Sequence, residues 1–134
     1  MAAPRVAVVG AGAWGTTLAR LIAGAEPVLL LCHSEAVAAE IGRTRRNERR
    51  LPGVDLPEGM VATADPTSLG AATELVIFAT PSRHLRATVA DVAPHLAPSA
   101  DLLFVVKGLE TGTLLRMSEV IASSADLPLE RVAA

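Results

Sequence analysis

The chain has 134 residues and a net charge of −2, which fits one domain with a sizeable core and gives no general attraction to nucleic acid or to an anionic membrane. Its longest strand-like apolar runs have five residues, far below the roughly 18 that a membrane span requires. The N-terminal apolar run is broken by glycines and has no basic segment before it, so a signal peptide is not expected. The single cysteine, Cys32, excludes an internal disulfide and favours a reducing, cytoplasmic location.

The first element of the chain is an apolar run, Arg5–Val9, that predicts a strand. Three glycines follow with the spacing G-x-G-x-x-G (Gly10, Gly12 and Gly15), and Thr16–Ala25 then has helical spacing. Strand, glycine turn and helix in this order form the dinucleotide-binding fingerprint. The first glycine allows a sharp turn, the second lets a pyrophosphate approach the backbone, and the third lets the helix pack closely on the strand. The free N–H groups of the first helical turn suit two phosphates.

Strand-like and helix-like segments alternate along the rest of the chain. Further strands are predicted at Val28–Cys32, Met60–Thr63, Leu75–Ala79 and Leu102–Val106. They are short and continuously apolar, which is typical of parallel strands covered on both faces. The order of the elements predicts an α/β fold, a doubly wound, Rossmann-like parallel sheet with helices on both faces and right-handed crossovers. The longest irregular stretch is Asn47–Gly59.

Helix signals lie between these strands. Ser34 is expected to cap a helix that runs to about Arg43, and Ser82 to cap a later one, while Pro66–Ala72 forms a turn or two. One face of the first helix carries Trp14, Leu18, Leu21 and Ile22. The inward faces of the last two are predicted to hold Leu85, Val89 and Val92, and then, within Thr113–Ala125, Leu114, Met117, Val120 and Ile121. Because Val132–Ala134 reads as the start of another strand, we expect residues 1–134 to be a dinucleotide-binding domain of a longer protein.

Six colinear motifs resemble the N-terminal domain of the NAD(P)-dependent glycerol-3-phosphate dehydrogenases. They are Gly10–Thr16 with its Trp14, Thr44–Asn47, Leu51–Val54, Ala79–Ser82, Lys107–Glu110 and Ser118–Ile121. The resemblance covers nearly the whole chain. It implies an enzyme that reduces dihydroxyacetone phosphate to sn-glycerol 3-phosphate with NAD or NADP as cofactor. The resemblance also implies a second, helical domain that carries the proton-donating lysine, and we expect that domain to lie outside residues 1–134.

The resemblance also implies roles for individual residues. Gly10, Gly12 and Gly15 form the cofactor turn, and the backbone N–H groups of Ala13 and Trp14 face the pyrophosphate. Trp14 could instead be a core aromatic. His33 and Ser34 match positions at the adenosine end of the cofactor, although Ser34 also serves as a helix cap and His33 could simply be solvated. Arg50 stands where the family often has an aromatic side chain beside the cofactor. Pro81, with Ala79 and Thr80, would lie under the ribose and nicotinamide, or could serve only to start a helix.

The choice between NAD and NADP is left open by the sequence. An acidic residue at the end of the second strand binds the ribose 2′-hydroxyl, and a basic one accepts a 2′-phosphate. This chain has Cys32-His33-Ser34-Glu35 there, with Glu35 expected in the first turn of the helix. Five arginines follow within eight residues, Arg43, Arg45, Arg46, Arg49 and Arg50. They could form a solvated face, or supply guanidinium groups that suit phosphate.

Lys107 is the candidate for substrate binding and chemistry. It is the one lysine among twelve basic residues and follows the strand predicted at Leu102–Val106. An ammonium is a compact point charge that fits a tight site, and the resemblance implies that it binds the phosphate or hydroxyl of the substrate and lies close to the cofactor. It could instead only end a strand. The expected partner is thus a small phosphate substrate, with no nucleic acid, membrane or metal, and a homodimer is left open.

Two other functions are compatible with the sequence. One is another NAD(P)-dependent dehydrogenase of this architecture, either ketopantoate-reductase-like or acting on a hydroxyacid, although Leu51-Pro52-Gly53 and Lys107-Gly108 argue against it. The other is a non-catalytic nucleotide-sensing module that keeps the fold and lacks the chemistry.

Overall fold

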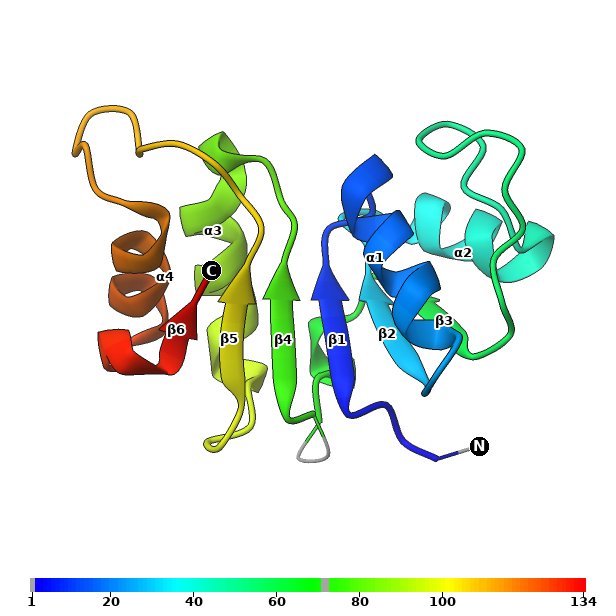
Figure 1. The fold of residues 1–134 in the computed structure, drawn as a ribbon, viewed down its shortest axis with the longest axis horizontal. Helices are drawn as coiled ribbons and strands as arrows, with labels where there is room; N and C mark the ends of the chain where they lie inside the picture. Colours follow the sequence, from blue (N-terminus) through cyan, green and yellow to red (C-terminus); the bar gives the residue numbers. More distant parts are fainter. Residues whose placement is uncertain (1, 71–72) are drawn as a thin grey trace.

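Six parallel strands form one sheet in the computed structural model, which describes residues 2–70 and 73–134 (Figure 1). The strands are β1 (Val6–Val9), β2 (Val28–Leu31), β3 (Met60–Thr63), β4 (Leu75–Phe78), β5 (Asp101–Phe104) and β6 (Val132–Ala133). Their order across the sheet is β3-β2-β1-β4-β5-β6, and each neighbouring pair is parallel. The predicted parallel sheet is confirmed, and β5 begins and ends earlier than the apolar run Leu102–Val106 indicated.

Helices cover both faces of this sheet. They are α1 (Ala13–Ala23), α2 (Glu35–Thr44), α3 (Ser82–Val92) and α4 (Met117–Ala125), with short 3-10 turns at Pro66–Ser68, Ala93–His95 and Leu129–Arg131. One apolar layer lies between the sheet and α1 and α2, and a second between the sheet and α3 and α4. No helix within the described ranges is long and apolar enough to cross a membrane.

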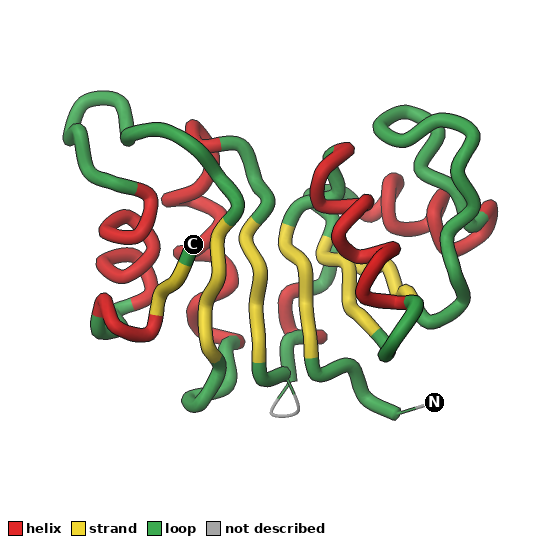
Figure 2. Tube along the Cα trace, viewed as in Figure 1, coloured by secondary structure: helices red, strands yellow, loops and turns green. Residues whose placement is uncertain are grey.

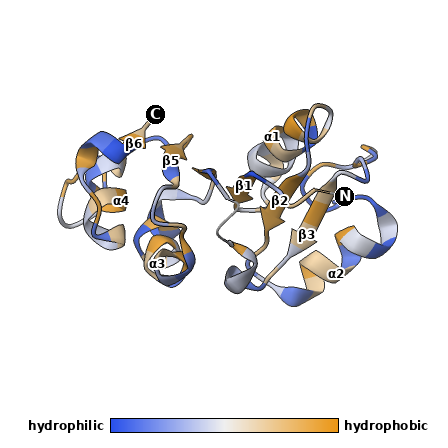
Figure 3. Ribbon diagram, turned by 90° about the horizontal axis from the view of Figure 1, so that it is seen from below, coloured by the Kyte–Doolittle hydropathy of each residue, from blue (hydrophilic) through white to orange (hydrophobic). Residues whose placement is uncertain are grey.

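The four inner strands β1, β2, β4 and β5 contribute side chains to both apolar layers, whereas β3 contributes only to the layer of α1 and α2 and β6 only to the layer of α3 and α4. Along β1, Val8 belongs to the layer of α1 and α2, whereas Ala7 and Val9 belong to the layer of α3 and α4. Side chains alternate between the faces of a strand, so a strand with a helix on each side must be apolar at every position. The strands accordingly carry hydrophobic colour along their length in Figure 3. Burial of both faces makes this sheet the rigid support from which the connecting loops extend.

Two predicted helix starts were wrong. Ser82 is the first residue of α3 and its side chain makes no capping bond, because Pro81, with ψ of 143°, takes the extended N-cap conformation. The last helix begins at Met117 and not at Thr113, since the carboxylate of Glu119 accepts the N–H of Arg116 at 2.8 Å and fixes the start there. Leu114, predicted on the core side, is therefore 72% exposed.

The other helix predictions are largely confirmed. The Ser34 hydroxyl accepts the N–H of Val37 at 3.2 Å and caps α2. The inward residues of α3 and α4 are buried: Leu85, Val89, Val92, Met117, Val120 and Ile121. Of the predicted turn Pro66–Ala72, residues Pro66–Ser68 form a 3-10 turn, and Ala71 and Ala72 lie outside the described residues.

The sheet order places a crevice beside β1. The chain passes from β1 to β2 and β3 on one side, and then continues from β4 to β6 on the other. The connections that follow β1 and β4 therefore run to opposite faces and leave space between them at the carboxyl ends of the two strands. In open α/β sheets this point is where ligands bind.

Candidate functional site

The turn between β1 and α1 depends on the absence of two side chains. Gly10 has a φ of +116°, and a Cβ there would lie 2.9 Å from the carbonyl carbon of Ala79. A Cβ on Gly15 would lie 1.9 Å from the carbonyl oxygen of Gly10. Only glycine at both positions lets α1 begin directly against the end of β1. A Cβ on Gly12, by contrast, would have no atom within 4 Å, so the backbone there faces open space.

That open space adjoins unpaired donors at the start of α1. The N–H of Thr16 donates to the carbonyl of Gly12 at 3.0 Å, which is the first hydrogen bond of the helix. The N–H groups of Ala13, Trp14 and Gly15 have no backbone acceptor among the residues that the structure describes. Unpaired amides and the aligned peptide dipoles place about half a positive charge at such an end. The turn can therefore bind an anion, and phosphate above all.

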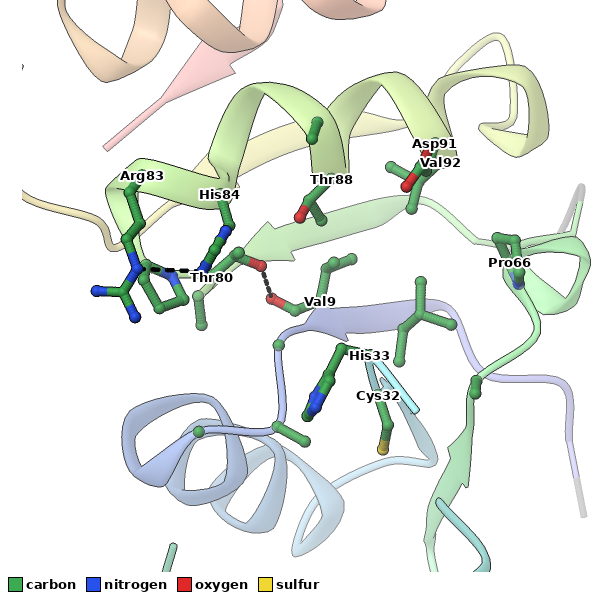
Figure 4. A pocket seen from close by; sticks show the side chains of 18 of the residues that line it. Val9, Cys32, His33, Pro66, Thr80, Arg83, His84, Thr88, Asp91 and Val92 are labelled. Carbon is green, nitrogen blue, oxygen red and sulfur yellow. Dashed lines mark hydrogen bonds between the residues drawn. The ribbon is translucent and has the colours of Figure 1, made fainter. Parts of the chain in front are cut away.

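A cleft of about 600 Å³ opens beside this turn at the carboxyl ends of β1, β2 and β4. In Figure 4 the exposed face of α3, with His84 and Thr88, lies on one side of it, and His33 lies on the other. Between them the hydroxyl of Thr80 donates to the carbonyl of Val9 at 3.3 Å and ties the ends of β4 and β1 together. The cleft is also lined by Gly10, Gly12, Arg50 and Pro81, four of the residues predicted to bind a cofactor.

The residues after β2 form the boundary with a second, smaller hollow of about 350 Å³. His33 is exposed and lines both spaces, while Ser34 lines only the smaller one and also caps α2. Cys32 is 4% exposed, and burial raises the pKa of its thiol to about 11. This thiol is therefore neutral and unreactive near pH 7. The residues Cys32, His33 and Ser34 at the end of β2 include no carboxylate that could repel or attract a ribose substituent.

The structure divides the cluster of arginines by role. Arg45 donates to the carbonyls of Pro57 and Met60, the latter at 2.9 Å, and so holds the loop before β3. Arg46 pairs with Asp55 at 2.7 Å and with Glu48 at 3.2 Å. Arg49 and Arg50 form no ion pair with any residue in the described ranges, and both line the smaller hollow. The cluster is therefore neither one solvated face nor one phosphate clamp.

Asn47 joins this arginine loop to the glycine turn. Its side chain is 4% exposed, and its Nδ2 donates to the carbonyl of Ala11 at 3.0 Å and to the hydroxyl of Thr16 at 2.9 Å. Both donors of the amide are thus used on the turn itself. The backbone carbonyl of Asn47 accepts the N–H groups of Arg50 and Leu51 at 3.1 and 2.7 Å. Sequence reasoning did not assign Asn47 this role, because its partners lie more than thirty positions earlier in the chain.

Trp14 is not a core aromatic. It is 56% exposed, on the same helix as Leu21, which is 64% exposed. The buried residues of α1 are Gly15, Thr16 and Ala19. The side chain of Ala13 is exposed too, so what these two positions present at the turn is their backbone N–H groups.

Lys107 lies outside both spaces. It follows β5 by three residues, is exposed, and precedes Gly108, whose φ is +109°. Its loop, residues 105–116, rises above the carboxyl ends of the strands on the side opposite the arginine loop (Figures 1 and 2). The structure therefore places Lys107 at the same carboxyl end of the strands as the cleft. Among the described residues, its side chain has no hydrogen bond or ion pair with another predicted site residue.

A carboxylate holds the Lys107 loop in place. Glu110 accepts two hydrogen bonds from the guanidinium of Arg86 on α3, at 2.8 and 2.9 Å, and one from the hydroxyl of Thr113 at 2.6 Å. Because these donors favour the ionised form, they lower the pKa of Glu110 from 4.5 to about 2. The loop is thereby tied to the helix that borders the cleft.

Comparison with known proteins points to one family. The sequence model of the family described as NAD-dependent glycerol-3-phosphate dehydrogenase N-terminus matches residues 5–133. Curated relatives named glycerol-3-phosphate dehydrogenase (NAD(P)+) include one from Corynebacterium urealyticum and one from Streptomyces coelicolor. Each is 41% identical over 130 residues, which make up 96% of this chain and 39% of the relative. The chain thus spans about two-fifths of the length of these relatives.

Solved structures agree with the family match. Glycerol-3-phosphate dehydrogenase from Coxiella burnetii superposes with a TM-score of 0.81 at 28% identity, covering 90% of this chain and 37% of that one. A ketopantoate reductase from Ralstonia eutropha superposes with a TM-score of 0.65 at 24% identity, covering 96% of this chain and 40% of that one. The second likeness shows a shared fold alone.

The Glu110 network predicts a pH-dependent contribution to stability. A folded-state pKa below the ordinary 4.5 means that Glu110 stabilises the fold fully above about pH 4.5 and loses this effect as the pH falls toward 2. Thermal unfolding of wild type and Glu110→Gln should thus differ by a constant amount from pH 7 to about pH 5, and the difference should shrink below that. Glu58→Gln, which removes an exposed carboxylate without an ion pair among the described residues, is the control. A difference that persists unchanged down to pH 3 would contradict the assignment.

Proposed function

The chain belongs to the NAD-dependent glycerol-3-phosphate dehydrogenase N-terminal family, and from this premise we propose that it is the cofactor-binding domain of an NAD(P)-dependent oxidoreductase acting on dihydroxyacetone phosphate. The reaction consumes the ketone, a hydride from the reduced cofactor and one proton, and gives sn-glycerol 3-phosphate and the oxidised cofactor. Relatives of the chain carry this activity in their names, and they are longer than the domain described above.

One observation carries the proposal. At the crevice beside β1, open space at Gly12 coincides with the unpaired N–H groups of Ala13 and Trp14. A pyrophosphate needs close approach to a backbone and several donors that no other group has claimed. Since a side chain at Gly12 would meet no protein atom within 4 Å, this space is open to a group from outside the chain.

The residues around the cleft fit the parts of a nicotinamide dinucleotide. The amides of Ala13 and Trp14 would hold the pyrophosphate, and His33, Ser34 and Arg50 would surround the adenosine end. Pro81, with the neighbouring Thr80, would lie under the ribose and nicotinamide. When bound, the cofactor supplies the hydride. The protein would position it, and the apolar lining of the cleft, which includes Val9, Leu31 and Val92, would limit the water around it.

Lys107 would serve the substrate. Reduction of a ketone requires a positive group for the substrate phosphate and a donor for the alkoxide that develops at the former carbonyl. Lys107 extends from a loop at the carboxyl ends of the strands, where the cleft also opens. Its ammonium can hold the phosphate or the hydroxyl of the substrate. The proton donor is assigned to the helical domain of the family, not to this chain.

The cofactor proposal predicts saturable binding of NADH or NADPH. Trp14 is the single tryptophan and adjoins the proposed pyrophosphate site. Titration with reduced cofactor should quench its fluorescence and produce energy transfer to the nicotinamide, whereas adenosine, which lacks both phosphates, should give neither signal at the same concentration. A sample that is folded by circular dichroism and gives no saturable signal with either cofactor would refute the proposal.

Lys107 can be tested for substrate binding in a chain that joins this domain to a substrate domain of the family. We expect Lys107→Ala to raise the KM for dihydroxyacetone phosphate by about tenfold or more, equivalent to roughly 1.4 kcal/mol. Arg116→Ala removes an exposed charge from the other end of the same loop and serves as the control. Unchanged kcat and KM for Lys107→Ala would remove Lys107 from the site.

A further inference from the structure

The end of β2 lacks the group that selects NAD. In dinucleotide-binding folds an acidic residue at this position accepts hydrogen bonds from the ribose 2′-hydroxyl and repels a 2′-phosphate. Here the strand ends in a buried neutral thiol, Cys32, followed by the exposed imidazole of His33 and the helix cap Ser34. Glu35 begins α2 and lines neither the cleft nor the smaller hollow. The group that selects between a 2′-hydroxyl and a 2′-phosphate therefore comes from another element.

The smaller hollow is lined by two guanidinium groups from the loop after α2. Arg49 and Arg50 border it together with His33 and Ser34, and Arg50 also borders the main cleft. The neighbouring Arg45 and Arg46 have their own carbonyl and carboxylate partners within the loop. Arg49 and Arg50 have no ion-pair partner in the parts of the chain that the structure describes. Two cations are thus exposed to whatever enters the hollow.

The charge balance of the hollow favours an anion. Its lining contains one carboxylate, Glu40, against the two guanidinium groups of Arg49 and Arg50. Glu40 lies six positions beyond the cap Ser34, more than one turn along α2. Guanidinium groups bind a phosphate through paired, charge-assisted hydrogen bonds, and two of them can neutralise a dianionic ester.

The loop that carries these arginines is fixed to the glycine turn. The side-chain amide of Asn47 donates both its hydrogens to the turn, at Ala11 and Thr16. Its backbone carbonyl accepts the N–H of Arg50. The arginines are therefore placed relative to the pyrophosphate site by a buried side chain. A ligand that spans the glycine turn and the smaller hollow would bind to a loop that is already in place, so its binding would not have to order that loop.

On the basis of the cofactor role proposed above, we propose that Arg49 and Arg50 form a subsite for the 2′-phosphate of NADP(H), so that this chain binds NADP(H) in preference to NAD(H). The subsite is the smaller hollow between His33, Ser34 and the arginine loop. The two arginines act as specificity-determining residues, and Asn47 is the positioning residue that holds their loop.

The adenosine half of the cofactor is the probe that isolates this subsite. Adenosine 2′,5′-bisphosphate and 5′-AMP differ only in the 2′-phosphate, and calorimetric titration measures the affinity of each without an activity assay. We expect the wild-type chain to bind the bisphosphate at least tenfold more tightly. Arg49→Ala and Arg50→Ala should each weaken binding of the bisphosphate by about fivefold or more and leave the affinity for 5′-AMP within twofold of wild type. Lysine in place of arginine at either position should restore part of the lost affinity.

Arg43→Ala is the matched control, because Arg43 belongs to the same cluster, is exposed, and lines neither space. It should leave the ratio of the two affinities unchanged. Since Arg49 and Arg50 are exposed and unpaired in the described chain, their variants should unfold at the wild-type temperature, which a thermal melt checks. A higher salt concentration should weaken binding of the bisphosphate more than binding of 5′-AMP.

Two results would overturn the inference. If both half-ligands, and NADPH and NADH, bind with equal affinity, the subsite does not exist while the cofactor role stands. If Arg43→Ala lowers the ratio as much as the other two variants do, the effect is one of overall charge and not of a subsite. Failure of every dinucleotide to bind would instead overturn the proposed function together with this inference.

Discussion

The helix α1 starts against the end of β1 because no side chain separates Gly15 from the carbonyl of Gly10. With a methyl group 1.9 Å from that oxygen, either the helix or the strand would have to move, and the core on that side is too closely packed to allow it cheaply. This contact sets where the first amides of α1 point. It also places them in the middle of the sheet, between β2 and β4, where the crevice opens. The anion-binding geometry of this turn is therefore a consequence of helix–strand packing.

Other parts of the site take their positions from this turn. Asn47 bonds to Ala11 and Thr16 on either side of Gly12 and so places the loop of Arg49 and Arg50 beside it. The hydroxyl of Thr80 bonds to Val9 and brings the start of α3 to the opposite side. Removing a buried amide that makes two hydrogen bonds lowers the free energy of unfolding by about 1–3 kcal/mol. Asn47 therefore contributes to the stability of the turn as well as to the placement of the arginines. The Lys107 loop is positioned separately, through Arg86 and Glu110.

Sequence reasoning located what depends on local pattern and missed what depends on distant partners. The strands and the glycine turn were predictable because apolar runs and G-x-G-x-x-G act within a few residues, as Met60–Thr63 and Gly10 illustrate. The start of α4 was misplaced because apolar spacing includes Leu114, whereas the capping by Glu119 decides the boundary. Asn47 and the division of the arginines could not be predicted, since their roles depend on which carbonyls and carboxylates the fold brings near them. No pattern in a single sequence reports such contacts.

The comparison of Gly12→Ala with Gly15→Ala tests the central claim most directly. Both add one methyl group to the same turn, one into open space and one against the Gly10 carbonyl. Urea unfolding and NADPH titration should separate them. Gly12→Ala should stay within about 1 kcal/mol of wild type, as expected for a change at a helix N-cap, and bind NADPH at least tenfold more weakly, whereas Gly15→Ala should lose about 1–3 kcal/mol or more of stability. If Gly12→Ala binds NADPH as tightly as wild type does, the space at this turn is not the pyrophosphate site.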